Sequence, residues 1–164
     1  MVDKKNVIMV SVIIPTYNHE KYIEQAIDSV LMQKTQYSME ILVGEDKSTD
    51  NTKKILQEYE KKHPDKITVY YRECNLSNAI LENAPDLRRR ALGKYIITLE
   101  GDDFWTDVNK IETQVKFLEE HPEYVAVSHL CNVVDENSQL INEDYPSCKQ
   151  EEYTLNHYLD GIYP

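Results

Sequence analysis

Short apolar runs alternate with longer amphipathic stretches along most of this chain, and this alternation restricts the fold more than any other feature. The apolar runs are rich in β-branched residues and occupy residues 10–15, 39–44, 67–71 and 94–99. The stretches between them suit helices of about ten to fifteen residues. Strands that alternate with such helices favour right-handed crossovers and a mainly parallel sheet. The pattern therefore predicts an α/β fold.

The expected helices follow from apolar residues at helical spacing. The first covers residues 20–31, and the second begins among the cap-forming residues 48–52 and ends at His63. A third helix, after a loop that starts near residue 75, includes the arginines at 88–90. The remaining expectations are a helix through residues 111–118 that ends at His121, a strand at 124–128, a hairpin that pairs 131–134 with 140–141, and a short helix at 154–159.

Polar and acidic residues follow three of the expected strands. Residues 16–18 follow the first, Glu45 and Asp46 follow the second, and residues 100–103 follow the strand at 94–99. In open parallel sheets, ligands bind beyond the carboxyl ends of the strands. We therefore expect these three segments to lie along one edge of the sheet, as parts of one binding site.

The segment at 100–103 places Glu100, Asp102 and Asp103 around Gly101. Three carboxylates this close repel one another unless a cation lies among them. Oxygen ligands without cysteine or histidine nearby favour Mg²⁺ or Mn²⁺. The glycines form neither a dinucleotide fingerprint nor a P-loop, so a bound diphosphate would have to be held through the metal.

Composition excludes several other partners. The formal net charge of −11 argues against nucleic acid and against anionic membranes bound through the general field of the protein. No run is long enough for a transmembrane segment, and no signal peptide precedes the first strand. Three widely spaced cysteines suggest neither a disulfide framework nor a zinc site. We expect a cytoplasmic location, including the inner face of the membrane.

Residues 10–18, 43–52 and 93–103 together resemble the family 2 glycosyltransferases of the GT-A fold, with all three motifs in the expected order. The resemblance implies a three-layer α/β/α sandwich and a nucleotide-sugar donor, with UDP as the expected nucleotide. It also implies metal-assisted transfer of a sugar to an acceptor hydroxyl with inversion. Residues 1–164 would be one truncated domain, with the nucleotide-sugar-binding half at about 8–128 and the start of the acceptor region at 129–164.

The resemblance also suggests roles for individual residues. Asp46 would accept a hydrogen bond from the uracil ring, beside Glu45, and the triplet at 100–102 would stand in the place of the family's Asp-x-Asp motif. The general base would lie beyond residue 164, so no catalytic residue is assigned. The expected nucleotide-binding residues are Pro15, Thr16, Tyr17, Asn18, Glu45, Asp46, Glu100, Gly101 and Asp102, and the expected metal ligands are Asp102 and Asp103.

The sequence departs from the family pattern at Glu45, Lys47 and Glu100, where aspartate, glycine and aspartate are usual. Two alternatives stay open: a nucleotidyl- or phosphotransferase with an acidic metal site, and a fragment that binds a nucleotide without catalysis. The acceptor would be a glycan, a lipid-linked molecule or a protein, in polysaccharide or cell-surface glycan biosynthesis. Four features have plainer, structural interpretations. Tyr17 could simply cover the first helix, and Asp50 starts a helix. Trp105 belongs to the core, and residues 88–90 form a solvated helix face.

Overall fold

A computed structural model of the chain describes residues 7–75, 79–142 and 153–154. The chain divides into two compact units, Met1–Phe117 and Leu118–Pro164. The first unit holds the parallel sheet and all of the residues expected to bind the donor. The second unit holds a small antiparallel hairpin.

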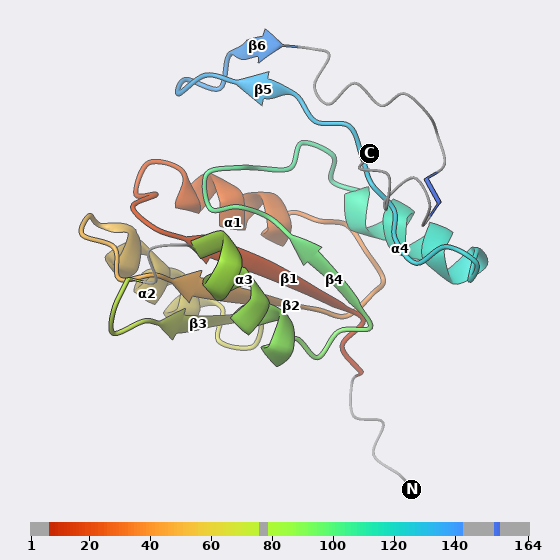
Figure 1. Cartoon of the computed structure of the whole chain (residues 1–164), viewed down its shortest axis with the longest axis horizontal. Helices are drawn as coiled ribbons and strands as arrows, with labels where there is room; N and C mark the ends of the chain where they lie inside the picture. The colour runs from red at the N-terminus through yellow and green to blue at the C-terminus, as the bar shows by residue number, and fades with distance from the viewer. Residues whose placement is uncertain (1–6, 76–78, 143–152, 155–164) are drawn as a thin grey trace, which may run out of the picture. The chain divides into compact units, whose positions relative to one another are not determined.

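The sheet of the first unit has four parallel strands: β1 (Val10–Thr16), β2 (Met39–Glu45), β3 (Ile67–Tyr71) and β4 (Tyr95–Thr98). Their order is β3-β2-β1-β4 (Figure 1). The expected parallel sheet is confirmed. Because all four strands run in the same direction, the segments that follow β1, β2 and β4 emerge at one edge. The second strand in chain order lies on one side of β1 and the fourth on the other.

Helices cover both faces of this sheet (Figure 1). The larger core cluster joins one face of the strands to α1 (Ile23–Leu31), α2 (Thr52–Lys62) and the first turns of α4 (Lys110–Glu120). The smaller cluster joins Ile13 and Leu42, on the opposite face, to Ala84 and Leu87 of α3 (Ala79–Arg90). The three-layer arrangement is therefore confirmed.

The expectation that the run at 94–99 is a buried strand is only partly correct. Leu99 is 5% exposed, but Ile96 is 44% exposed. The physical reason is the position of β4, which is the last strand in the order of the sheet within the described residues. Tyr95 and Ile97 pack against the larger core cluster, whereas Ile96 points to the other face.

In the second unit, β5 (Val133–Val134) pairs with β6 (Leu140–Asn142) in an antiparallel ladder, so the expected hairpin is confirmed. The strand expected at 124–128 is wrong. This fully described stretch contains no strand, and Val125 is 99% exposed. Apolar β-branched residues form a strand only where a neighbouring backbone is available to bond with them. Most of the helix expected at 154–159 lies outside the described residues.

None of the helices in the described part of the chain combines the length and the apolar character needed to cross a bilayer.

Candidate functional site

Backbone hydrogen bonds join the three predicted loops at the carboxyl edge of the sheet. The amide of Asp46 donates to the carbonyl of Thr16 at 3.0 Å, and the amide of Gly101 donates to the carbonyl of Pro15 at 3.2 Å. The loop after β1 therefore lies between the other two, because β1 lies between β2 and β4. The structure thus brings together the three segments that the sequence predicted to be neighbours.

Gly101 allows the acidic loop to approach the loop after β1 closely. A Cβ atom at this position would lie 2.6 Å from both Thr16 Oγ1 and His19 Nδ1, and 2.8 Å from Thr16 Cβ. Real Cβ atoms essentially never lie this close to other heavy atoms. A glycine is therefore required here by the contact itself.

His19 bridges the same two loops, although the sequence assigned it no role. Its Nδ1 atom lies 3.2 Å from Thr16 Oγ1, and its Nε2 atom lies 3.9 Å from Asp102 Oδ2. The histidine side chain is 22% exposed. Its position in the loop that directly follows β1 is the sequence feature from which a role in the site could have been predicted.

The acidic loop is electrostatically strained without a cation. Partial burial raises the pKa of Glu100, and repulsion from Asp102 and Asp103 raises it further. Partial burial and repulsion from Asp102 likewise raise the pKa of Asp103. His19 opposes both shifts but does not cancel them. Each shift means that the ionised carboxylate is less favourable here than in water, which is the condition that a bound cation relieves.

These residues fit a divalent ion that takes most of its ligands from elsewhere. Asp102 and Asp103 are exposed, and Asp102 forms a long ion pair with His19. No group of three or more histidine, cysteine, aspartate or glutamate residues in the described part of the chain could enclose a metal. Mg²⁺ commonly binds through one or two carboxylates, with water and substrate phosphates as its other ligands. The donor set suits that arrangement and does not suit a site built wholly from protein.

Glu45 and Asp46 reach the predicted edge, but their side chains are buried at 0% and 1% exposure. Glu45 Oε1 accepts a hydrogen bond from the Ser48 amide, whereas Glu45 Oε2 has no partner. Between them and Ser48, Lys47 has a φ of 60°, in the region that favours glycine. The turn therefore has the backbone conformation that a glycine at position 47 would adopt. A ligand can contact these carboxylates only if neighbouring side chains move.

Asn18 fixes the loop after β1 to the loop after β2. Its amide donates to Ser48 Oγ at 3.0 Å, and its Oδ1 atom accepts from the Thr49 amide at 2.8 Å. Asn18 itself has a φ of 57°, a conformation that asparagine tolerates better than most residues. Its side-chain oxygen is therefore already engaged in holding the two loops together.

Asp50 strengthens the same junction. One of its carboxylate oxygens accepts from the Thr52 amide at 2.9 Å, at the start of α2, and the other accepts from the Glu20 amide at 3.0 Å. The expectation that Asp50 starts a helix is confirmed. The sequence did not predict its second contact, which ties α2 to the segment before α1.

Gln33 holds the far end of the acidic loop. Its side-chain Nε2 donates to the carbonyl of Asp107 at 2.8 Å, and its Oε1 accepts from the amide of Ile111 at 3.1 Å. Trp105, between these anchors and Gly101, is 6% exposed and belongs to the larger core cluster, as expected. The loop is thus anchored on both sides of Asp102 and Asp103.

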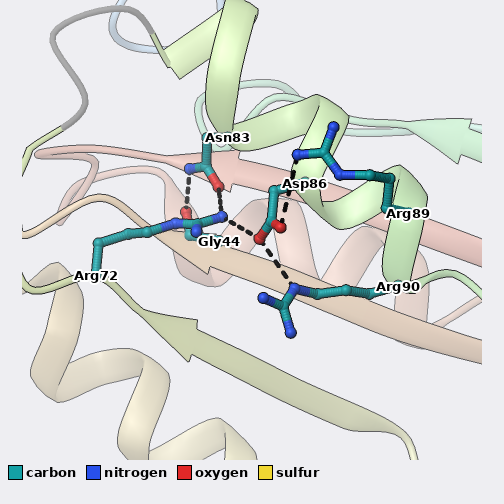
Figure 2. A network of polar contacts seen from close by, with 6 residues as sticks. All are labelled: Gly44, Arg72, Asn83, Asp86, Arg89 and Arg90. Carbon is teal, nitrogen blue, oxygen red and sulfur yellow. Dashed lines mark hydrogen bonds and ion pairs between the residues drawn. The ribbon is translucent and has the colours of Figure 1, made fainter.

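The sequence did not predict a polar network next to β2, which is buried at Asn83 but exposed at Arg89 and Arg90 (Figure 2). Asn83 of α3 donates to the carbonyl of Gly44 at 2.7 Å and accepts from Arg72 Nη2 at 3.0 Å. Arg72 also contacts Asp86 at 2.7 Å, and its backbone amide donates to the carbonyl of Glu45 at 2.9 Å. A Cβ at Gly44 would collide with Asn83, so the glycine makes room for this contact.

The arginines at 88–90 are exposed, as expected for a helix face. Arg90 bonds to Asp86 at 2.9 Å and lies over the Tyr70 ring, and Arg89 lies 3.8 Å from Asp86. Arg89 and Arg90 thus contact residues of α3 and β3. Tyr17, in the loop after β1, is 38% exposed, so its side chain is accessible.

Solved glycosyltransferases share this fold. The structure of TarS residues 1–349 of S. aureus with UDP-GlcNAc is 27% identical in sequence to this chain. The match covers 70% of this chain and 32% of that TarS chain, with a TM-score of 0.57. A second TarS structure contains UDP. The mannosyltransferase PcManGT of Pyrobaculum calidifontis, with GDP-Man and Mn²⁺, is 28% identical, with 66% of this chain and 32% of that chain covered and a TM-score of 0.57. The fold of this protein is therefore that of the GT-A glycosyltransferases.

The family follows from the sequence match. A family model described as glycosyl transferase family 2 matches residues 11–159, and the chain belongs to that family. Among curated relatives, TuaG of Bacillus subtilis, which is named for teichuronic acid biosynthesis, is 41% identical over 112 residues, or 68% of this chain and 42% of TuaG. The chain spans about two fifths of the length of TuaG and of a relative from Mycobacterium bovis that is 35% identical to this chain.

Proposed function

We propose that this chain binds a nucleotide-sugar donor, with UDP as the nucleotide, at the carboxyl edge of the sheet, and that the whole protein transfers the sugar to an acceptor hydroxyl with inversion. The observation that carries the proposal is the junction of three loops at this edge, joined by the Asp46–Thr16 and Gly101–Pro15 backbone bonds. The TarS structures with UDP and UDP-GlcNAc support the choice of nucleotide.

In this proposal the loop after β1 receives the nucleoside. Tyr17 has an accessible ring that can stack on a base, and Pro15, Thr16 and Asn18 are proposed to contact the nucleoside beside it. Asp46 accepts the uracil N–H, beside Glu45. Both carboxylates are buried, so the base reaches them only after a local rearrangement of side chains.

The acidic loop receives the ribose and the diphosphate. Glu100 and Gly101 lie on the ribose side, and Asp102 and Asp103 hold Mg²⁺ or Mn²⁺. When bound, such an ion stabilises the negative charge that develops on the departing diphosphate. PcManGT, whose structure contains Mn²⁺ with its donor, supports a divalent ion at this edge.

The proposed transfer is a single displacement. The acceptor oxygen forms a bond to the anomeric carbon while the bond from that carbon to the diphosphate oxygen breaks, and the hydroxyl proton passes to a base. We assign no residue of this chain as that base. The acceptor is proposed to be a glycan, a lipid-linked molecule or a protein on the cytoplasmic side, and the name of TuaG supports cell-surface polysaccharide.

A thermal-shift panel tests the proposal, because a ligand that binds only the folded state raises its melting temperature. UDP, GDP, ADP and the corresponding triphosphates would each be added with Mn²⁺ or with a chelator. We expect the largest rise for UDP with Mn²⁺. A larger rise with a triphosphate would favour the nucleotidyl- or phosphotransferase alternative, and no rise with any nucleotide would refute donor binding.

A further inference from the structure

We propose that His19 is a positioning residue of the donor site, which holds the carboxylate of Asp102 in place for the metal–diphosphate group. This inference rests on the proposed function. His19 is not itself a ligand in this scheme, and it acts through Asp102. Residues that orient metal-binding carboxylates commonly contribute about tenfold or more to metal affinity.

The backbone of His19 is fixed by the start of α1. Its carbonyl accepts hydrogen bonds from the amides of Tyr22 and Ile23, both at 2.9 Å. The backbone of Gly101 packs directly against its ring, since a Cβ there would lie 2.6 Å from Nδ1. The backbone of His19 is therefore held by the start of α1, while its ring packs against the acidic loop.

The two ring nitrogens face different partners. Nδ1 lies 3.2 Å from the hydroxyl of Thr16, and Nε2 faces the carboxylate of Asp102 at 3.9 Å. A proton on Nε2 would be attracted by that carboxylate, whereas a bare lone pair on Nε2 would be repelled by it. At 3.9 Å the contact with Asp102 is electrostatic and too long for a direct hydrogen bond.

Thr16 is the residue that orients the His19 ring in this scheme. Its side chain is buried, and its hydroxyl can donate to Nδ1, which leaves the proton on Nε2. Asp102, by contrast, has an exposed side chain and would otherwise be free to rotate. The chain thus orients an exposed carboxylate through a histidine that is itself oriented by a buried hydroxyl.

Two substitutions separate positioning from simple packing. The amide of His19→Asn reaches the place of Nδ1 and keeps the contact with Thr16, whereas the amide of His19→Gln reaches the place of Nε2 and keeps the contact with Asp102. His63→Gln is the matched control, because His63 lies at the other end of the strands, after α2 and before β3. Calorimetry would give the affinity for Mn²⁺ at saturating UDP and the affinity for UDP with a chelator, and thermal melts would report stability.

We expect His19→Asn to weaken Mn²⁺ binding about tenfold, while His19→Gln stays within about threefold of the unmodified chain. UDP affinity with chelator should change in neither. Equal Mn²⁺ affinity in His19→Asn and the unmodified chain would overturn the inference. The inference would also be overturned if His19→Asn and His19→Gln lost Mn²⁺ affinity equally and in proportion to the fall in their melting temperatures. If the unmodified chain binds no UDP with Mn²⁺, the proposed function itself fails and this inference fails with it.

Discussion

At the scale of single residues, close contacts determine the shape of the candidate site. Gly101 lets the acidic loop pack against Thr16 and His19, and Lys47 and Asn18 adopt left-handed conformations in the adjoining turns. Neither of the latter positions is a glycine, although both conformations favour one. The close approach of backbone segments thus determines much of the local geometry, and the carboxylates of the acidic loop project from a backbone that these contacts hold in place.

Replacing Gly101 with alanine should weaken UDP binding with Mn²⁺ and destabilise the chain by about 1–3 kcal/mol, the usual cost of forcing atoms into a packed site. Gly93→Ala is the matched control, because its Cβ would lie 2.5 Å from the Ser11 backbone at the other end of β4. Urea unfolding and calorimetry would measure both effects. Unchanged Mn²⁺-dependent binding in Gly101→Ala, beside a similar loss of stability in both variants, would contradict the role of the glycine in the site.

Charge crowding in the acidic loop predicts a stabilising substitution. The pKa of Asp103 is raised in the folded chain, mainly by burial and then by Asp102, so its ionised form disfavours folding. Without metal, the destabilising contribution of this carboxylate should therefore disappear as the pH falls through that raised value. Asp103→Asn should melt slightly higher at neutral pH in chelator, because solvent screens much of this charge crowding, and the difference should shrink at acidic pH.

Asp65→Asn provides the comparison for that experiment, because Asp65 is an exposed acid in the turn before β3. It should change the melting temperature little at either pH. Added Mn²⁺ should stabilise the unmodified chain more than Asp103→Asn. The explanation by charge crowding would be untenable if Asp103→Asn melted no higher than Asp65→Asn at neutral pH.

At the scale of the elements, side chains from one element satisfy backbone groups of another. Gln33 links the segment after α1 to the start of α4, and Asn83 links α3 to β2. The sequence predicted the helices from their apolar residues but gave no indication of these polar links. Periodicity reports which side of a helix is apolar, and it does not report which buried amide meets which carbonyl.

Asn83→Ala should cost about 1–3 kcal/mol of unfolding free energy, because it removes a buried hydrogen bond to the Gly44 carbonyl and one of the two side-chain hydrogen bonds of the Arg72 guanidinium. Arg89→Ala removes only an exposed ion pair of 3.8 Å and should cost less than about 1 kcal/mol. Denaturation in urea would compare the two. Similar small losses would mean that the network shown in Figure 2 contributes little to the attachment of α3.

At the scale of the whole molecule, most of the sheet was predictable from the sequence. The strands β1 to β4 and the shared edge follow from apolar runs that end in polar loops, a signal that is local in the chain. The position of β4 at the end of the sheet order, and the exposure of Ile96, could not be predicted, because they depend on which strands become neighbours. The strand expected at 124–128 failed for the same reason.

The candidate site was predictable to a similar extent. The motifs identified the three loops, but the burial of Glu45 and Asp46 and the bridge through His19 arise only in three dimensions. Membership of glycosyl transferase family 2 confirms the expected family. The individual roles of the site residues stay predictions.

The central claim is that Asp102 and its neighbours bind a nucleoside diphosphate through a divalent ion. Calorimetry of UDP binding, with Mn²⁺ and with a chelator, tests this claim most directly in the unmodified chain, in Asp102→Asn and in Asp65→Asn. We predict binding that Mn²⁺ strengthens, that is weakened at least about tenfold in Asp102→Asn when Mn²⁺ is present, and that is unchanged in Asp65→Asn. Equally strong UDP binding with chelator, or in Asp102→Asn, would contradict the claim.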